Sequence, residues 1–372
     1  MWRRRCLEEN TAEVFKNWSC FIVSEGNGIK ISVIIPVYEV EEQLLDRCLN
    51  SLLEQTEKKI EVLIVCDMPG DRYRKLVDQY RNRGMRIRME EQNHQGVSAA
   101  RNRGLKMAEG QWISFTDADD WLSEDALEKL CRTAEENQAE IVMGEHRMEY
   151  GSRTLAHSYQ EKTVVFEGKN RTLFEMDTLR PQTGAGFVWG KLFSKSMLDR
   201  EQLFFQVGLS AAEDAEFMFR AACAASRIAY ITDVCYHYWF NPASAVRKYR
   251  SDYAERYICS MEALRRDIEE RPSVKYCLET YYSCVLYHLL LIVVNYSFHP
   301  ESPKSAGDQV KEFRELLKKP IFKEALEHIH YGDFSKTRQI TLLCVQLRLY
   351  SVLRLIVKVR HRQFRQYSGK QG

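Results

Sequence analysis

Along residues 31–143, short apolar runs alternate with segments in which apolar residues recur at helical spacing. The runs predict strands that are buried on both faces, as in a parallel sheet, and they lie at 31–36, 60–65, 85–89, 112–115 and 140–143. The segments between them predict helices near 44–52, 71–83, 97–108 and 123–136. Strands that alternate with helices of this length indicate βαβ units, so we predict an α/β fold with a mostly parallel sheet.

The pattern changes after residue 145. Short strands are predicted at 162–166, 187–193 and 228–231 around a helix at 213–225, and helices alone follow at 252–269, 275–296, 308–328 and 338–365. We therefore expect an N-terminal extension at 1–28, an α/β domain at 29–248 and a helical C-terminal region at 249–372.

Polar side chains stand where three of the predicted strands end. Tyr38 and Asp67 follow the first two strands, and Asp117 and Asp119 follow the strand at 112–115. In parallel sheets, ligands bind at the carboxyl ends of the strands, so these side chains are candidates for one shared site. Asp117 and Asp119, two positions apart in an extended segment, point the same way and offer the oxygen ligands that Mg²⁺ or Mn²⁺ prefers. By spacing alone, an acidic turn that caps the next helix is an equal alternative.

The composition limits the class of partner. Of the 372 residues, 45% are hydrophobic and 28% charged, which is typical of a folded soluble protein, and the net charge of +2 favours no nucleic-acid partner. The eleven cysteines include no C-x-x-C pair, which indicates reduced thiols and a cytoplasmic location. We predict no signal sequence and no transmembrane segment, because the longest apolar run, 285–294, is about half as long as a spanning helix.

The C-terminal part of the chain is strongly basic. From Phe334 onward there are nine lysines and arginines and no acidic residue, which leaves a net charge of −7 for residues 1–333. Polar side chains, Ser351 and otherwise basic residues, recur every three or four positions between Arg348 and Arg365, with apolar residues on the remaining face of the predicted helix 338–365. This pattern is typical of an amphipathic helix on an anionic membrane surface, here a peripheral contact at the inner face of the cell membrane. A helix that packs on the core and exposes a basic face to solvent is an equal alternative.

Motifs that follow one another over about 31–245 resemble glycosyltransferase family 2, the inverting nucleotide-sugar transferases with the GT-A fold. They are Ser32-Val-Ile-Ile-Pro36-Val-Tyr38, Gly96-Val-Ser-Ala-Ala-Arg101-Asn102-Arg-Gly104, Thr116-Asp117-Ala-Asp119-Asp120, Trp189-Gly-Lys191-Leu-Phe193, Glu213-Asp214, and Tyr236-His-Tyr238 with Ser244. The resemblance implies that an acceptor hydroxyl displaces a nucleoside diphosphate, with UDP as the expected nucleotide, from C1 of a hexosyl or N-acetylhexosaminyl donor. A glycan or lipid-linked acceptor would suit surface polysaccharide synthesis.

The resemblance also implies roles for the acidic residues. Asp119 would hold Mn²⁺ or Mg²⁺, with Asp117 nearer the ribose and the outer shell of the metal, and Asp214 would take the proton of the acceptor hydroxyl. Glu213 would orient Asp214 or be the second choice for the base. By themselves, Glu213 and Asp214 also suit the acidic first turn of a helix, where the helix dipole favours negative charge, and both interpretations can hold together. Asp120 is the least specific of the aspartates and suits a helix cap.

Residues on the donor side follow from the same motifs. Pro36, Tyr38 and Glu39 would line the nucleotide-sugar site, with Glu39 at a position where the family commonly has Asn. Asp67 would bind the nucleotide base, and Tyr38 could stack on it. Arg101 could pair with phosphate or brace the edge of the sheet.

Residues on the acceptor side are Trp189 and Lys191. Trp189 offers a flat apolar face for a sugar ring, although a core position suits it equally. His237 is a candidate third metal ligand, with a structural histidine as the alternative.

One segment departs from the family pattern. The second strand of the family usually ends in D-D-G-S-x-D, whereas this chain has Cys66-Asp67-Met68-Pro69-Gly70-Asp71. We therefore expect a nucleotide-side loop of different shape. The departure keeps a second class of function open, a catalytically silent GT-A module that binds nucleotide or glycan as a scaffold.

Overall fold

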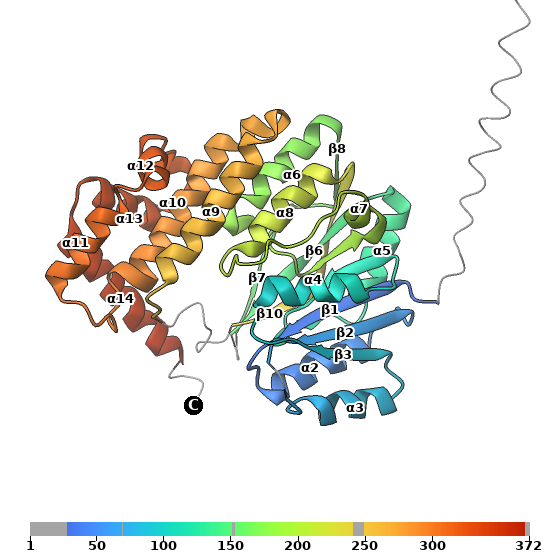
Figure 1. Cartoon of the computed structure of the whole chain (residues 1–372). Coiled ribbons are helices and arrows are strands. Elements are labelled where there is room, and N and C mark those ends of the chain that lie inside the picture. The colour runs from blue at the N-terminus through green and yellow to red at the C-terminus, as the bar shows by residue number, and fades with distance from the viewer. Residues whose placement is uncertain (1–27, 69, 151–152, 241–248, 369–372) are drawn as a thin grey trace, which may run out of the picture.

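The computed structural model describes residues 28–68, 70–150, 153–240 and 249–368 (Figure 1). Parts of the sequence that carried predictions lie outside the described residues: the N-terminal extension up to residue 27, Pro69, Ser244 and the side chain of Arg365.

A ten-stranded sheet in the order β3-β2-β1-β4-β9-β6-β10-β5, with β7 beside β6 and β8 beside β10, forms the centre of the α/β part. Its strands are β1 (Ile31–Val37), β2 (Ile60–Cys66), β3 (Ile87–Glu91), β4 (Trp112–Phe115), β5 (Trp121–Leu122), β6 (Ile141–Glu149), β7 (Thr154–Ala156), β8 (Val164–Glu167), β9 (Lys191–Ser194) and β10 (Arg227–Trp239). The neighbours from β3 to β4 are parallel, as is the pair of β6 and β10, whereas β9 runs antiparallel between β4 and β6. This mixed, mostly parallel sheet confirms the predicted α/β class.

Helices cover both faces of this sheet. They are α2 (Glu42–Leu53), α3 (Arg74–Asn82) and α5 (Ala126–Asn137) on one face, and α4 (Val97–Met107), α6 (Arg171–Thr178), α7 (Lys195–Arg200) and α8 (Glu213–Ala224) on the other. Within β1, Val33 and Ile35 belong to the first of these cores and Ile34 to the second. Successive strand residues point to opposite faces, so the unbroken apolar run of β1 is buried on both sides.

The remaining helices form a block beside the sheet, with α6 and α8 between that block and the strands (Figure 1). They are α9 (Tyr253–Glu269), α10 (Leu278–Ile292), α11 (Ala306–Leu316), α12 (Pro320–Glu327), α13 (Lys336–Gln346) and α14 (Tyr350–Ser368). Their core also contains Leu179 and Phe219, so the helical region and the α/β part share buried apolar side chains. Within the described chain, the segment Pro272–Ser297 is long and apolar enough to cross a membrane, but 78% of its most apolar window is buried, as in a core helix.

Two predicted helices are each divided in the structure. The helix expected at 308–328 ends at Leu316, because Pro320 begins a new helix after the extended residue Lys319. The helix expected at 338–365 is interrupted between Gln346 and Tyr350, where Arg348 has a φ of +56°. A left-handed residue cannot continue an α-helix, so the chain changes direction there.

The helix α14 has two chemically different sides. Tyr350, Leu353 and Val357 are buried in the helical core. The outward side carries an apolar stripe, Val352, Leu355 and Val359, and next to it a basic stripe, Arg354, Lys358 and Arg362, all exposed. The structure therefore confirms core packing for one side of this helix, and contact of the exposed side with a membrane stays a prediction.

This division predicts opposite effects for two neighbouring leucines. Leu353→Ala should destabilise the protein by about 2–5 kcal/mol, because it opens a cavity in a fully buried position. Leu355→Ala, at a position that is 61% exposed, should change stability by about 0.5 kcal/mol or less. Chemical denaturation of the two variants and the wild type measures both effects, and equal midpoints would contradict the assignment of the two sides.

Candidate active site

Three neighbouring strands bring predicted site residues to one edge of the sheet. Tyr38 follows β1, Asp67 follows β2 and Asp117 follows β4. Because these strands pair in parallel, their carboxyl ends lie side by side. The structure thus gathers the donor-side and metal-side candidates at the edge where α/β sheets bind ligands.

Arg101 joins this edge to the start of α8. Its guanidinium is 3% exposed and donates to the carboxylates of Asp117 (3.2 Å), Glu213 (3.1 Å) and Asp214 (2.5 Å). Burial lowers the pKa of Arg101, but the charges of these acids outweigh burial and raise it, so the cation persists. Arg101 therefore binds three carboxylates rather than only bracing the sheet edge, and no sequence spacing predicts partners more than a hundred residues away.

Asp214 lies in an environment suited to a general base. Burial raises the pKa of Asp214 to about 7, where Glu213 and Asp117 add to the rise and Arg101 and the backbone N–H of Val188 oppose it. A carboxyl group with a pKa near neutrality exchanges protons effectively at physiological pH. Glu213 and Asp214 also form the acidic first turn of α8, which confirms that interpretation, and the role of a base stays a prediction beside it.

The first turn of α8 begins in an unusual conformation. Ala212, directly before the helix, has a φ of +53°. A residue with a Cβ atom adopts this left-handed conformation only at a cost in free energy. The carbonyl oxygens of Ser210 and Ala211 accept hydrogen bonds from Arg256 and Ser260 of α9. The helical region thus holds the turn that delivers Glu213 and Asp214.

Asp120 is a structural residue. It is fully buried, and its carboxylate accepts hydrogen bonds from the Tyr236 hydroxyl and the Trp239 backbone N–H, both at 2.7 Å. These bonds tie the aspartate turn to β10. The helix cap suggested for Asp120 is wrong, because α5 begins only at Ala126.

Asp119 differs from Asp120 in that none of the side chains described by the structure donates to its carboxylate. Burial and the charge of Asp117 raise the pKa of Asp119 to about 6. Two neighbouring carboxylates that repel each other in a partly buried site are stabilised by a bound cation. The donor set of Asp117 and Asp119 therefore fits a hard divalent ion.

Arg47 of α2 supports the same turn and carries no recognisable signal in the sequence. One of its terminal nitrogens, Nη2, donates to the Asp119 carbonyl oxygen at 2.7 Å. Its guanidinium lies 3.9 Å from the ring centre of Trp121 and 4.7 Å from that of Trp239. Cation–π contacts with two indole rings fix the arginine, and through it the backbone of Asp119.

Asp67 is buried, and its carboxylate forms hydrogen bonds with other residues of the chain. It accepts hydrogen bonds from the Gln92 side chain (2.8 Å) and from the backbone N–H groups of Gln95 (2.7 Å) and Gly96 (2.8 Å). Asp67 thus fixes the loop before α4, which places Arg101. Contact with a nucleotide base, which the resemblance implies, would be an addition to this role.

The other donor-side candidates lie nearer the surface. Tyr38 is 53% exposed and meets the ring of His94 edge-on, with ring centres 5.8 Å apart. Pro36 is partly buried within β1, and Glu39 is exposed with a φ of +46°. The face of the Tyr38 ring is therefore accessible to a flat partner.

His237 is held away from the aspartates. Its Nδ1 contacts Glu149 (2.8 Å), its Nε2 contacts the Ser123 hydroxyl (3.1 Å), and its ring stacks on Trp121. Within the described part of the chain, the two aspartates and His237 do not form a group of three converging ligand atoms. The prediction of a third metal ligand is therefore replaced by a structural role, because both ring nitrogens already have protein partners.

Trp189 and Lys191 lie below the surface. Trp189 is 6% exposed and stacks between Phe187 and Tyr236, with both ring-centre distances at 4.6 Å. Lys191 is buried and donates from Nζ to the Gly184 carbonyl oxygen at 3.0 Å. Burial lowers the pKa of Lys191 to about 7. Neighbouring side chains cover both residues, so Trp189 occupies a core position, and an acceptor-side role for the two residues stays a prediction.

Comparisons with known proteins agree with this architecture. Residues 32–201 match the family described as glycosyl transferase family 2. The chain is 26% identical over 333 residues to the putative glycosyltransferase EpsH of Bacillus subtilis (strain 168), which covers 86% of this chain and 92% of EpsH. It is 28% identical over 335 residues to the uncharacterized glycosyltransferase EpsJ of the same strain, which covers 89% of this chain and 96% of EpsJ.

Among solved structures, residues 1–349 of TarS from S. aureus share the fold with a TM-score of 0.63 at 20% identity, over 90% of this chain and 92% of that one. The same TarS fragment has also been solved with UDP-GlcNAc, and that structure matches with a TM-score of 0.61. TarS is a poly(ribitol-phosphate) beta-N-acetylglucosaminyltransferase. The likeness covers the helical region as well as the sheet, so the α/β part has the GT-A fold, and residues 32–201 form a domain of glycosyl transferase family 2.

Proposed function

We propose that this glycosyltransferase moves a hexosyl or N-acetylhexosaminyl group from a UDP-linked donor to a hydroxyl of a glycan or lipid-linked acceptor in surface polysaccharide synthesis. The proposal depends most on one observation: Arg101 binds Asp117 of the donor-side turn and Asp214 of α8 at once. The Arg101 guanidinium thereby holds Asp117, which would lie near the leaving group, close to Asp214, which can take a proton. The UDP-GlcNAc complex of the structurally similar TarS supports the choice of donor nucleotide.

Asp214 is the proposed base. The acceptor oxygen forms a bond to C1 of the sugar while the Asp214 carboxylate takes the hydroxyl proton. The bond between C1 and the diphosphate oxygen breaks, and its electron pair leaves with the diphosphate. Attack from the face opposite the leaving group inverts the configuration at C1. The pKa of about 7 keeps a large fraction of Asp214 ionised at neutral pH and still basic enough to accept a proton.

The site must also stabilise the negative charge that develops on the leaving diphosphate. Asp119, with Asp117 beside it, would hold Mn²⁺ or Mg²⁺, which as a Lewis acid stabilises the negative charge of the departing diphosphate. Asp117 would also approach the ribose, since its carboxylate is 33% exposed while it accepts from Arg101. Tyr38, with its accessible ring, would stack on the uracil.

The outward side of α14 supplies a surface for membrane contact. Its apolar stripe and basic stripe lie next to each other, and no acidic residue occurs between residue 334 and the C-terminus. Apolar side chains that enter the lipid interface beside lysines and arginines at the anionic headgroups are the pattern of a peripheral amphipathic helix. This contact would bring the enzyme to an acceptor carried on a lipid at the inner face of the membrane.

Replacing the proposed base should abolish most of the turnover. Asp214→Asn should lower kcat by about 10²- to 10⁴-fold, because the amide cannot accept the proton. Wild-type kcat should fall as the pH drops below about 7, since protonated Asp214 is no longer a base. Release of UDP from a panel of UDP-sugars measures both effects. Glu213→Gln is the matched control and should lose much less, so the opposite order would assign the base to Glu213.

Replacing the proposed metal ligand should remove cation binding together with turnover. Asp119→Asn should lower kcat by at least about 100-fold, because charge stabilisation at the leaving group is worth several kcal/mol. Calorimetric titration with Mn²⁺ in the presence of UDP should show binding to the wild type and none to the variant. Unchanged Mn²⁺ affinity in a folded Asp119→Asn protein would refute the ligand assignment.

Membrane contact should depend on the apolar stripe. The full-length wild type should co-sediment with vesicles that contain phosphatidylserine and remain in solution with phosphatidylcholine alone. The combined variant Val352→Ser, Leu355→Ser and Val359→Ser should lose this binding and keep its thermal stability, because all three positions are exposed.

The basic stripe provides the electrostatic control. The combined variant Arg354→Gln, Lys358→Gln and Arg362→Gln should weaken binding by about 1 kcal/mol per removed charge and reduce its dependence on salt. Equal sedimentation of the wild type and the apolar-stripe variant would show that this surface does not bind membranes.

A further inference from the structure

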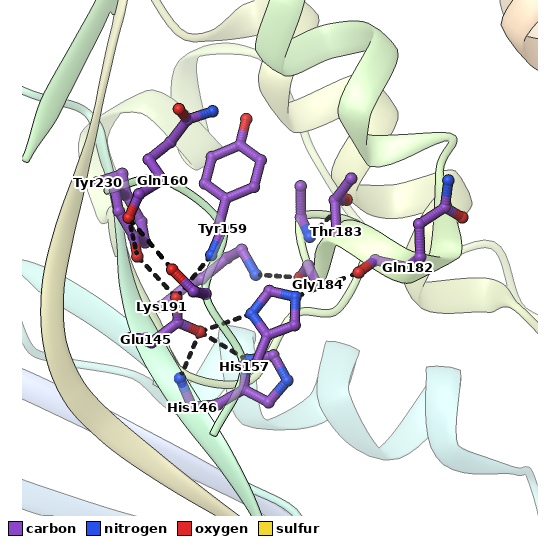
Figure 2. A network of polar contacts seen from close by, with 12 residues as sticks. Glu145, His146, His157, Tyr159, Gln160, Gln182, Thr183, Gly184, Lys191 and Tyr230 are labelled. Carbon is purple, nitrogen blue, oxygen red and sulfur yellow. Dashed lines mark hydrogen bonds and ion pairs between the residues drawn. The ribbon is translucent and has the colours of Figure 1, made fainter. Parts of the chain in front are cut away.

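A second polar cluster lies around Glu145 of β6 (Figure 2). One carboxylate oxygen, Oε1, accepts from the backbone N–H of His146 (2.9 Å) and from Nδ1 of His157 (2.6 Å). The other, Oε2, accepts from the backbone N–H of Tyr159 (2.8 Å) and the Tyr230 hydroxyl (2.6 Å). Every contact of this buried carboxylate is therefore with the chain itself.

Glu145, His146 and His157 bring three possible metal ligands within 4.8 Å of one another, but the orientation of the rings opposes coordination. The two imidazoles stack with ring centres 4.2 Å apart and planes 23° from parallel. The lone pairs of ring nitrogens lie in the ring planes, so those of stacked rings do not converge on one ion at about 2 Å. The cluster is thus a hydrogen-bond network.

The partners of His157 define its charge. Its Nδ1 faces the Glu145 carboxylate, and its Nε2 faces the Gln182 carbonyl oxygen at 3.1 Å. Both partners are acceptors, so both nitrogens carry hydrogen and the ring is an imidazolium. Burial lowers the pKa of His157, but the hydrogen bond and charge of Glu145 outweigh it and raise the pKa. Burial lowers the pKa of the stacked His146, so that ring stays neutral.

This network holds the loop 181–188 at two carbonyl oxygens. His157 donates to Gln182, and Lys191 donates from Nζ to Gly184 at 3.0 Å (Figure 2). Gly184 has a φ of +74°, and a Cβ atom there would come within 3.0 Å of the His146 ring. The loop therefore rests against both imidazoles and is held by hydrogen bonds from the partly buried His157 ring and the buried Lys191 amine.

The far end of the same loop reaches the first turn of α8. The backbone N–H of Val188, a fully buried residue, lowers the pKa of Asp214. Gly186 packs beside Ala215 of α8, where an added Cβ would lie 3.7 Å from the alanine Cβ. The loop thus connects the Glu145 network to the residue proposed as the base.

We propose that Glu145, His157 and Lys191 are positioning residues that hold the loop 181–188 against the first turn of α8, beside Asp214. The inference rests on the proposed role of Asp214 as the base. A backbone N–H near a carboxylate favours its ionised form, as that of Val188 does for Asp214. If the loop moves away, the pKa of Asp214 rises, and Asp214 is ionised only at a higher pH.

Two substitutions of His157 test this inference. The amide of glutamine can occupy the place of Nε2 and still donate to Gln182, whereas the amide of asparagine can occupy the place of Nδ1 and donate only to Glu145. His157→Asn should lower kcat by about 10- to 100-fold and move the acid limb of kcat to higher pH, with the KM of the donor unchanged. His157→Gln should restore most of kcat and the wild-type limb.

The groups that face Asp214, namely Arg101, Glu213, Asp117 and Lys191, are unchanged in both variants, so a shift of the limb reports on the loop. Tyr230→Phe removes a donor to Glu145 without touching the loop, and it should lower the thermal midpoint but leave the limb in place.

The possible outcomes separate the two proposals. If His157→Asn is folded and its kcat and acid limb match the wild type, the positioning role is refuted. Rescue by asparagine instead of glutamine would also refute it, because the contact with Glu145 alone would then suffice. If Asp214→Asn itself turns over normally, the proposed base fails, whatever the His157 variants do.

Discussion

The buried guanidinium of Arg101 is the interaction on which the site depends. Asp117, Glu213 and Asp214 come from segments about a hundred residues apart, and without a cation between them their charges would repel one another in a poorly solvated site. The planar fork of arginine reaches all three through its two terminal nitrogens, which the compact ammonium of a lysine would not do. Removal of one member of such a buried group typically costs about 3–5 kcal/mol, so the geometry of the site and the stability of the fold are coupled here.

The fold was predictable where local pattern and tertiary structure agree. The apolar runs of β1, β2 and β4 and the helical spacing between them are sufficient to predict a parallel sheet, and the strand ends then locate Tyr38 and Asp117. The predictions of the helix ends were less accurate. A single left-handed residue, Arg348, divides one of the predicted helices, and the amphipathic pattern continues through it without a visible break.

The chemistry of single residues was harder to predict than their location. The partners of Asp120, Tyr236 and Trp239, lie 116 and 119 positions away, and only the fold reveals that this carboxylate is structural. Trp189 and Lys191 have residue types that suit sugar recognition, but the structure buries both, and burial depends on packing against residues far along the chain, such as Tyr236 beside Trp189. The Glu145 network was missed for the same reason, since its members share no spacing.

The left-handed residue Ala212 has a consequence for how far the catalytic unit extends. The family match ends at residue 201, before the strained turn and before the helix that carries Asp214. The carbonyl oxygens on the near side of that turn are bound by Arg256 and Ser260 of α9, and Phe219, later in α8, is buried in the helical core. The helix that bears Asp214, the proposed base, is therefore contacted at the turn before it and at Phe219 by a region that bears none of the family motifs. The reaction proposed for this enzyme thus requires a longer part of the chain than the part that matches the family.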